Sequence, residues 1–258
     1  MPRTIAITTV FNEERTVISV LNDIANYADA VIVVNDGSQD SSREKIERWK
    51  EARDNIYFIS MRENRGQSQA LKRAYALIKY LLEKRKLSPE DLVVELDSDG
   101  QHDPNYIRAL CGRKLGNPSV DIVLARRDFS FYPRYKVWGN RLLTLIASLL
   151  SGKRYEDVES NYRVMEAQLY LPLLDYFLGH RYSGAFETGI ITGLLGYTTD
   201  NSLVVKTPCY RAGARAFDAL HVLACGLWAW TRVKLKARSN DLDSLTSMAL
   251  AEWTDGHR

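Results

Sequence analysis

Two carboxylates that could hold a metal ion, Asp97 and Asp99, stand one residue apart directly after the apolar run 92–96. Asp103-Pro104 then favours the start of a helix, with the Asp as N-cap and the Pro at the first helical position. Carboxylate oxygens are ligands that hard cations such as Mg²⁺ and Mn²⁺ prefer. A cation on two carboxylates keeps coordination positions free for phosphate oxygens. The pair therefore predicts a metal–phosphate site on a loop after a buried strand.

Several other kinds of site are excluded by their missing residues. An EF-hand loop beginning at Asp97 needs Gly and Glu where the chain has His102 and Arg108. Neither G-x-G-x-x-G nor G-x-x-x-x-G-K-[ST] occurs, which argues against the common dinucleotide and P-loop sites, and no Gly-rich activating loop of a nucleotidyltransferase follows the first strand. The three cysteines are widely spaced without a C-x-x-C pair, which argues against a zinc site or disulfide framework and favours a reducing cytoplasm.

The net charge of +3 is unevenly placed along the chain. Residues 126–141 carry a local charge of +4 and residues 206–238 one of +6, so the rest of the chain is acidic. Such asymmetry indicates an anionic partner facing the second half, with scattered solvated charges as the alternative. We expect no nucleic-acid partner.

Strand-like and helix-like segments alternate along the chain, which predicts an α/β fold with a doubly wound, mostly parallel sheet. The expected strands are 4–10, 31–34, 56–60, 92–96 and 120–125, with shorter ones at 161–166 and 203–207. One expected helix follows the turn at 11–14, a second begins at a capping box of Ser41 and Glu44, and a third begins at Asp103. The other expected helices cover 67–86, 142–150, 167–178, 186–195 and 217–230. Ligand sites in such sheets lie at the carboxyl ends of the strands, where Glu13, Asp36, Asp97 and Asp99 should converge.

The C-terminal region reads as an addition to one large domain. Residues 217–230 form an apolar segment with basic residues at its end, which fits a helix lying on a membrane of anionic lipid and fits a packed core helix equally well. From Ser239 the tail is polar and we expect it to be loosely held. We expect no signal peptide, and no apolar run approaches the roughly 18 residues that span a bilayer. We expect a cytoplasmic protein with peripheral membrane contact.

Five motifs follow one another along the chain: V-F-N-E-E, V-V-N-D-G-S-Q-D, N-R-G-Q-S-Q-A, D-S-D-G-Q-H-D-P and D-V-E-S-N-Y-R-V. In this order and spacing they resemble family 2 glycosyltransferases of GT-A fold. The fourth is similar to the D-A-D-G-Q-H-D-P signature of the dolichol- or polyprenyl-phosphate mannose synthase-like branch. The resemblance implies a Rossmann-like GT-A domain over 1–216, with a nucleotide-sugar half to about 125 and an acceptor half over 126–216, followed by an amphipathic helix and tail at 217–258.

For the sugar donor, the resemblance implies a GDP- or UDP-linked hexose of mannose or glucose type, bound with Mg²⁺ or Mn²⁺. Glu13 would hold the ribose and Asp36 the nucleobase. The implied metal and diphosphate residues are Asp97, Asp99 and Gln101. The residues expected around the nucleotide sugar are Thr9, Val10, Glu13, Asp36, Asn64, Gly66, Asp97 and Ser98.

For the acceptor, the resemblance implies a polyprenyl or dolichyl phosphate. Arg127 matches an Arg that meets the acceptor phosphate, while the next phosphate-binding Arg of the family falls on Tyr132, so Arg134 or Lys136 would replace it. Asp157 and Arg163 match a D-x-x-G-x-x-R segment, with Ser160 in place of its Gly. The residues expected at the acceptor phosphate are Arg127, Arg134, Lys136, Asn140, Arg211 and Arg215.

The expected chemistry places negative charge on the leaving diphosphate, which a cation held by Asp97 and Asp99 stabilises. Attack from the opposite side inverts the sugar. A phosphate acceptor is already an anion and needs a cation, Arg127, to position it. A hydroxyl acceptor instead needs a carboxylate base to take its proton, and Asp157 is the first candidate and Glu187 the second. Both acceptors remain open at this point, and a sugar-nucleotide-binding module without turnover is the third alternative.

Overall fold

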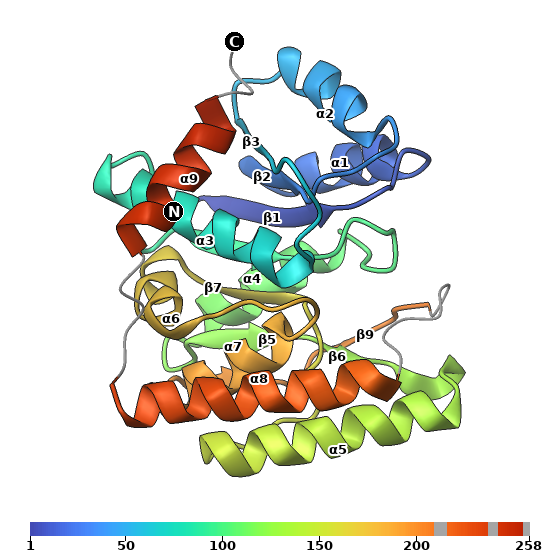
Figure 1. The fold of residues 1–258 in the computed structure, drawn as a ribbon, viewed down its shortest axis with the longest axis vertical. Coiled ribbons are helices and arrows are strands. Elements are labelled where there is room, and N and C mark those ends of the chain that lie inside the picture. The colour runs from blue at the N-terminus through green and yellow to red at the C-terminus, as the bar shows by residue number, and fades with distance from the viewer. Residues whose placement is uncertain (209–215, 237–241, 255–258) are drawn as a thin grey trace.

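The computed structural model describes residues 1–208, 216–236 and 242–254. Its main sheet has the strand order β3-β2-β1-β4-β7-β5-β8, and β6 pairs separately with β9 (Figure 1). The strands are β1 (Thr4–Val10), β2 (Ala30–Asn35), β3 (Ile56–Ser60), β4 (Leu92–Glu95), β5 (Ile122–Leu124), β6 (Arg126–Arg127), β7 (Arg163–Glu166), β8 (Thr199–Asp200) and β9 (Val204–Val205). The helices are α1 (Val17–Ala25), α2 (Ser42–Glu51), α3 (Gln67–Glu83), α4 (Tyr106–Gly116), η1 (Phe129–Phe131), α5 (Arg134–Ser151), η2 (Ala167–Leu169), α6 (Tyr170–Tyr176), α7 (Gly184–Leu194), α8 (Ala216–Lys234) and α9 (Leu242–Thr254).

The first half of the sheet is parallel, as the sequence predicts. β1 pairs with β2 and with β4, and β2 pairs with β3, all in the same direction. Every residue of β2 is buried, which explains its fully apolar run, because helices cover both faces of a parallel sheet. The carboxyl ends of these four strands therefore lie at one edge of the sheet.

Alternate side chains of each strand enter two separate cores. Ile5 and Ile7 of β1 pack with α3, α6 and α7 on one face, whereas Ala6 and Val10 pack with α1, α2 and α4 on the other. This alternation is the two-residue period of a strand. The α/β, doubly wound architecture is confirmed.

The second half of the sheet departs from the parallel pattern at β7. This strand lies between β4 and β5 and runs antiparallel to both, which places Arg163 opposite Glu95. β6 leaves the main sheet after β5 and pairs with β9, with Arg127 opposite Val205. The residues after β5 and those before β7 are thereby brought back to the edge where β4 ends.

Two expected helix starts are wrong in detail. The Ser41 hydroxyl donates to Glu14 Oε2 at 2.6 Å instead of capping α2, so the capping box of Ser41 and Glu44 does not form. Asp103 Oδ1 accepts from the backbone N–H of Asn105 at 2.9 Å, and α4 begins only at Tyr106. For Ser41, the carboxylate of Glu14 on the loop after β1 takes the hydroxyl that would otherwise cap α2.

The C-terminal region is more ordered than the polarity of the sequence indicates. α8 packs against α5 and α7, with Val222, Cys225 and Ala229 buried. The tail expected to be loosely held contains α9, which packs against α3 and β3 and brings Trp253 to Tyr57 and Tyr80. That expectation is wrong. Among the described residues, no helix is long and apolar enough to cross a membrane.

Candidate functional site

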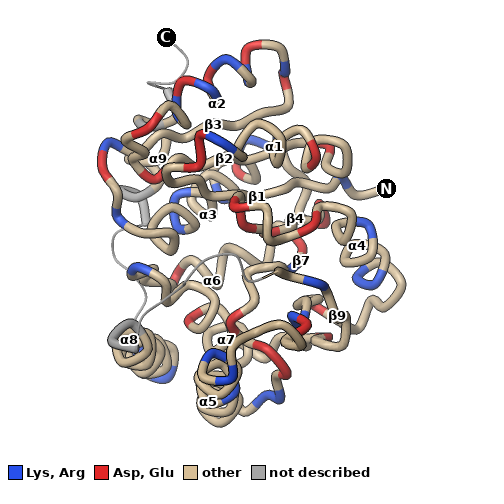
Figure 2. The backbone as a smooth tube through the Cα atoms, turned by 90° about the vertical axis from the view of Figure 1, so that its right-hand side faces the viewer, with Lys and Arg blue, Asp and Glu red and all other residues tan. Residues whose placement is uncertain are grey.

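Hydrogen bonds between loops join the carboxyl ends of β1, β2 and β4. The Ser98 hydroxyl donates to Thr9 O at 2.7 Å, which ties the loop after β4 to the end of β1. Asn12 N donates to Ser38 Oγ at 3.0 Å, which ties the loop after β1 to the loop after β2. In Figure 2, acidic segments lie beside β1 and β4, and basic segments lie on α4 and α5. The residues expected around the nucleotide sugar are thus gathered at one edge.

Asp36 fixes the turn that leads into α3. Its Oδ1 accepts from Arg65 N at 2.8 Å and its Oδ2 from Gly66 N at 2.9 Å. Gly66 has φ +92°, and a Cβ there would lie 2.8 Å from the Cα of Arg181, so both backbone and space require glycine. Burial raises the pKa of Asp36 and the two N–H donors oppose that rise. Asp36 therefore shapes the Asn64–Gly66 turn that the sequence places at the nucleotide.

The other residues expected near the nucleotide lie around the end of β1. Val10 is buried, and its carbonyl accepts from Asp36 N at 2.8 Å. Glu13 is buried in the loop between β1 and α1, where its Oε2 accepts from the Thr16 hydroxyl at 3.1 Å. Asn64 is exposed.

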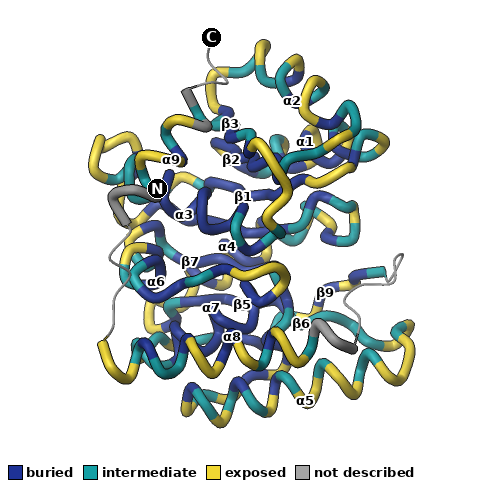
Figure 3. The backbone as a smooth tube through the Cα atoms, in the orientation of Figure 1, coloured by how far each residue is buried: buried dark blue, intermediate teal, exposed yellow. Residues whose placement is uncertain are grey.

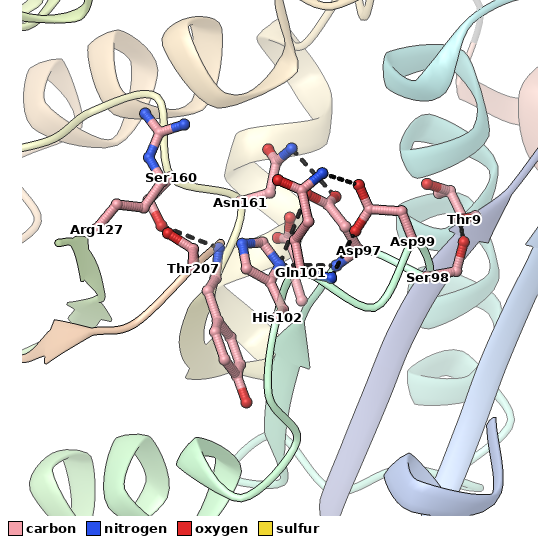
Figure 4. Close-up of polar contacts among 12 residues, drawn as sticks. Thr9, Asp97, Ser98, Asp99, Gln101, His102, Arg127, Ser160, Asn161 and Thr207 are labelled. Carbon is pink, nitrogen blue, oxygen red and sulfur yellow. Dashed lines mark hydrogen bonds and ion pairs between the residues drawn. The ribbon is translucent and has the colours of Figure 1, made fainter. Parts of the chain in front are cut away.

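The two aspartates of the loop after β4 are held in different ways. Asp97 Oδ1 accepts from Gln67 Nε2 at 2.6 Å and from Asn161 Nδ2 at 3.3 Å. Asp99 Oδ1 accepts from Gln101 N at 2.9 Å, and its Oδ2 accepts from Gln101 Nε2. Figure 4 shows Asn161 and Gln101 reaching toward the aspartates, which point toward one another from a single loop. We call Asp97, Asp99 and Gln101 the acidic clamp.

The acidic clamp has the donor chemistry of a hard-cation site that a ligand must complete. Asp97 and Asp99 are both partly exposed, so their oxygens can be reached from solvent. No group of three or more His, Cys, Asp or Glu side chains among the described residues is arranged to hold a metal ion. Two carboxylates and an amide oxygen are fewer ligands than Mg²⁺ or Ca²⁺ takes, and phosphate oxygens or water must supply the rest.

His102 supports the loop of the acidic clamp. Its Nδ1 accepts the backbone N–H of Asp97 at 3.0 Å, and its ring lies against that of Tyr162, with 4.9 Å between centroids. The contact of Nδ1 with Asp97 Oδ2 is longer, at 3.6 Å. Because Nδ1 accepts the backbone N–H of Asp97, it carries no hydrogen to donate to the Asp97 carboxylate. The 3.6 Å contact is therefore not an ion pair.

A second polar group joins Arg127, Asp157 and Asn140. Arg127 Nε donates to Asp157 Oδ2 at 2.8 Å and Nη2 donates to Oδ1 at 2.8 Å, a two-pronged ion pair. Asn140 of α5 accepts from Arg127 Nη2 at 2.7 Å and donates to Asp157 Oδ1 at 3.0 Å. We call these three residues the Arg127 cluster. The structure therefore brings together three residues that the sequence assigns to the acceptor.

The geometry disfavours both candidate bases. Asp157 is fully buried, and although burial opposes it, Arg127 holds the pKa of Asp157 below its usual value. Glu187 is fully buried as well, and its Oε2 accepts from the backbone N–H groups of Leu178 and Gly179. Both carboxylates are engaged by donors of the protein and neither is exposed to an acceptor.

The remaining acceptor residues are less closely gathered. Arg134 is exposed at the first residue of α5, and Lys136 is partly exposed two residues further along the same helix. Beside the Arg127 cluster lies a pocket of about 250 Å³, which Arg126, Arg127 and Arg141 line together with Asp128, Phe129, Glu156 and Val204. Arg141 is a basic residue the sequence motifs do not assign. Arg211 and Arg215 lie outside the described residues.

The segment 157–163 connects the Arg127 cluster to the acidic clamp. Asp157 stands at one end and Asn161 reaches Asp97, so four residues, or at most about 14 Å of extended chain, separate them. In Figure 4, Asn161 lies between Arg127 and the aspartates. Arg163 fixes the end of the segment by donating to Ser160 O at 3.0 Å and lying 3.8 Å from Glu95 Oε2.

Three residues near the site were missed by sequence reasoning. Gln67 and Asn161 both donate to Asp97, and Glu159 lies between the two groups. Gln67 follows the N-R-G turn and Asn161 lies in the fifth motif, but no local pattern shows that their side chains meet Asp97. For Asn161 the signal that could have found it is the position of β7 beside β4, and for Gln67 it is the packing of α3 over β1 and β2. Both require the sheet order, which no local pattern supplies.

Comparison with known proteins gives consistent results. A family model described as "Glycosyl transferase family 2" matches residues 5–170. An uncharacterized protein of Methanocaldococcus jannaschii is 30% identical over 171 residues, which are 64% of this chain and 72% of that protein. The UDP-N-acetylglucosamine–dolichyl-phosphate N-acetylglucosaminyltransferase of Methanococcus voltae is 28% identical over 203 residues, covering 70% of this chain and 76% of that enzyme.

Solved structures show the same fold. Glucosyl-3-phosphoglycerate synthase of Mycobacterium tuberculosis, solved with Mg²⁺ and UDP, is similar with a TM-score of 0.64 at 19% identity, covering 89% of this chain and 80% of that one. Its complex with Mn²⁺, UDP-glucose and phosphoglyceric acid gives a TM-score of 0.63 at 17% identity with the same coverage. The likeness spans more of the chain than the family model does.

Proposed function

The chain belongs to glycosyltransferase family 2, with the GT-A fold, and we propose that it transfers a hexose, with inversion, from a nucleotide diphosphate sugar to a polyprenyl phosphate. The observation that carries the proposal is the connection of the acidic clamp to the Arg127 cluster through the segment 157–163. One group suits a metal-bound diphosphate and the other suits an anionic acceptor.

On the donor side, the acidic clamp would hold Mg²⁺ or Mn²⁺ between Asp97, Asp99 and the diphosphate. When bound, the cation stabilises the charge that develops on the leaving phosphate. Gln67 and Asn161 keep Asp97 in place by donating to its Oδ1, which leaves its Oδ2 for the cation. We favour UDP over GDP as the carrier, because a UDP-sugar enzyme stands among the relatives and the similar structures contain UDP.

On the acceptor side, a phosphate would meet the guanidinium groups that line the pocket beside the Arg127 cluster. Asp157 holds Arg127 in one orientation, and a fixed guanidinium needs no reorganisation when the phosphate arrives. The phosphate oxygen is an anion already, so the reaction needs no base. The burial and pairing of Asp157 and Glu187 support this acceptor over a hydroxyl, and the dolichyl-phosphate enzyme among the relatives supports it independently.

A lipid acceptor requires that the protein meet a membrane, and α5 offers a surface for this. Large apolar side chains recur along one side of α5 at intervals of three, four, three and four residues, and Phe131 of η1 precedes them. These side chains and their exposed fractions are Phe131 86%, Tyr135 70%, Trp138 69%, Leu142 56%, Leu145 56% and Leu149 74%. From Tyr135 to Leu149 the spacing places them on one stripe of α5, about 21 Å long.

The neighbouring helix α8 extends this surface. It lies beside α5 (Figures 1 and 3) and exposes Leu220, Leu227 and Trp228. Leu235, directly after the helix, is exposed as well. We call the exposed apolar residues of η1, α5 and α8 the apolar face. Exposed apolar surface on two adjacent helices is unusual for a monomer and marks an interaction site. The helix that carries the stripe also carries Asn140, so the apolar face adjoins the acceptor site.

A bilayer fits the apolar face better than a second copy of the chain. Arg134 and Arg141 on α5 and Lys234 and Lys236 at the end of α8 add positive charge to its border. Two copies meeting face to face would set these cations against one another, since a two-fold interface uses the same surface twice. Anionic headgroups instead attract each of them by about 1 kcal/mol. We therefore propose peripheral attachment through α5 together with α8.

The test of the function is a transfer assay with radiolabelled UDP-N-acetylglucosamine, UDP-glucose and GDP-mannose, each with Mn²⁺ and a polyprenyl phosphate. Label should enter the lipid fraction with at least one donor. It should be lost in Asp99→Asn and retained in Asp103→Asn, which changes an exposed carboxylate of the same loop. Label that enters a saccharide or small alcohol, and never the lipid phosphate, would refute the acceptor.

A further inference from the structure

The pocket beside the Arg127 cluster contains one arginine, Arg141, whose charge is not neutralised by a described carboxylate. The other two arginines that line the pocket of about 250 Å³ each have a partner. Asp157 lies 2.8 Å from Arg127, and Glu156 lies 3.7 Å from Arg126. Among the described residues, no carboxylate lies within ion-pair distance of Arg141, and its recorded contact is with an aromatic ring. An anion that enters the pocket therefore meets an unpaired positive charge at Arg141.

The other charged groups nearby do not take over this role. Asp128 also lines the pocket, but its Oδ1 accepts from the backbone N–H of Ser130 at 3.0 Å and so caps η1. Arg134 and Lys136, which the sequence offers for the acceptor phosphate, lie on the same helix as Arg141 but do not line the pocket. The residue directly before Arg141 belongs to the Arg127 cluster, so α5 itself brings Arg141 to the site.

Two arginines of the pocket each lie beside an aromatic ring. Arg127 Cζ is 5.3 Å from the centroid of the Phe129 ring, and Arg141 Cζ is 6.0 Å from that of Trp138. Phe129 lines the pocket, whereas Trp138 is 69% exposed and belongs to the apolar face. The pocket thus combines cationic groups with an aromatic wall, and its arginine on α5 adjoins the apolar face. A ligand with an anionic head and an apolar chain fits this combination.

The volume of the pocket limits how much of such a ligand it encloses. Pockets that enclose a whole drug-sized ligand have about 300 Å³ or more. At about 250 Å³, this pocket holds a phosphate head and the beginning of a chain, so the rest of a long chain must leave it. Phe131 is 86% exposed two residues after Phe129, and η1 precedes α5. A chain that leaves between Phe129 and Trp138 therefore reaches the part of the apolar face near the start of α5.

We propose that Arg141 binds the acceptor phosphate and that Trp138, three residues earlier on α5, contacts the first isoprene units of its chain. The ligand is then a phosphate monoester that carries an apolar chain, and head and chain are recognised by neighbouring turns of one helix. This inference rests on the proposed function and extends it. Arg141 serves any phosphate, whereas Trp138 distinguishes a lipid phosphate from a small soluble one.

The experiment uses farnesyl phosphate in solution, without membranes, so that vesicle binding plays no part. It measures the KM for farnesyl phosphate and the constant for competitive inhibition by inorganic phosphate in the native chain, Arg141→Gln and Trp138→Ala. Arg141→Gln should raise both constants at least about tenfold, the loss typical of a hydrogen bond to a charged group. Trp138→Ala should raise the KM about tenfold by removing apolar contact and should leave inhibition by inorganic phosphate unchanged.

Three further variants separate these effects from damage to the fold. Arg141→Lys keeps the charge and should recover most of the native KM. Arg108→Gln removes an exposed arginine of α4 that lies 4.9 Å from the ring of Tyr27, and Leu115→Ala removes an exposed apolar side chain of the same helix. Both should keep the native KM for farnesyl phosphate. The donor KM and the thermal unfolding midpoint should be the same in all variants, because the substituted side chains are exposed.

Several outcomes would overturn the inference and leave the proposed function standing. They are a native KM in Arg141→Gln or in Trp138→Ala, and a native chain that inorganic phosphate does not inhibit. Equal loss of phosphate inhibition in both variants would show that Trp138 only supports Arg141 and would overturn the chain contact. A native chain that transfers sugar to glycerol phosphate as readily as to farnesyl phosphate would do the same. A native chain that transfers no sugar to farnesyl phosphate would refute the proposed function itself.

Discussion

Arg127 and Asp157 are joined by two parallel hydrogen bonds of 2.8 Å in a site where Asp157 is fully buried. Each member is therefore a partner that the other needs, because an unpaired buried charge is far more costly than a paired one. The sequence offers Asp157 as a candidate catalytic base, whereas its two hydrogen bonds to Arg127 favour a role in orienting that guanidinium group. This distinction can be tested by stability as well as by activity.

Asp157→Asn should destabilise the protein by about 3 kcal/mol, because it leaves the mostly buried Arg127 side chain, 19% exposed, beside a neutral amide. Acceptor KM should rise while kcat changes little, since the cation loses its fixed orientation and no proton transfer is removed. Urea unfolding measures the first effect and steady-state kinetics the second. Glu156→Gln breaks an exposed contact of 3.7 Å with Arg126 and should cost less than about 1 kcal/mol. A stable Asp157→Asn protein without turnover would instead support the base.

Asp99→Asn should abolish the stabilisation that UDP and Mn²⁺ confer together. A ligand at a hundred times its dissociation constant stabilises a protein by about 2.7 kcal/mol, which corresponds to roughly 5 °C in a chain of this size. The native chain should show a shift of this order in a thermal unfolding scan, and Asp103→Asn should keep it. A full shift in Asp99→Asn would mean that the acidic clamp is not the metal site.

Much of the fold could be predicted because its patterns are local. Buried parallel strands such as β2 read as short apolar runs, and the strand-to-loop junction at Asp97 shows in the sequence itself. Pairings between distant residues could not be predicted in this way. Gln67 begins α3, which packs over β1 and β2, and this placement brings its side chain to Asp97 although β3 and β4 are not neighbours. Ser41 bonds Glu14 instead of its own helix because the loops after β1 and β2 lie side by side.

The polarity of the tail predicts a loosely held segment, and this prediction is wrong because a few residues are enough to pack α9 against α3 and β3. α9 is anchored by Ala249, which is buried, and by Trp253, whose ring lies 6.4 Å from that of Tyr57 and 6.1 Å from that of Tyr80. A single aromatic between two others can hold a helix whose composition is otherwise unremarkable. This contact is itself open to a test.

Trp253→Ala should lower the free energy of unfolding by about 2 kcal/mol, less than a fully buried Trp would cost, because the residue is partly exposed. Urea unfolding followed by circular dichroism measures the change. Leu235→Ala removes a side chain that is 73% exposed and should leave the unfolding midpoint unchanged. Equal midpoints for both variants would show that α9 contributes nothing to stability.

Glu159 should make the stability of the chain depend on pH in a definite direction. Burial raises its pKa from 4.5 to about 7, so the native state retains a proton that the unfolded chain has lost between these values, and stability falls as pH rises through that window. Glu159→Gln removes this loss. Urea unfolding should show the variant gaining about 2 kcal/mol over the native chain at pH 8 relative to pH 5. A difference that does not change with pH would refute the raised pKa.

Leu142→Glu should weaken attachment to membranes without unfolding the protein, because it places a charge in the middle of an exposed apolar stripe. Leu142 is 56% exposed, and losing its apolar contact while adding a charge repelled by anionic headgroups should reduce vesicle binding at least tenfold. Co-sedimentation with phosphatidylglycerol-containing vesicles at low salt measures the binding.

Leu115→Glu makes the same substitution at a residue that is 53% exposed on α4, away from the apolar face, and should bind vesicles as the native chain does. Transfer to a membrane-embedded polyprenyl phosphate should fall with binding in Leu142→Glu, whereas transfer to farnesyl phosphate in solution should not. If both Leu→Glu variants bind vesicles like the native chain, the apolar face is not the membrane contact, and a second protein becomes its better occupant.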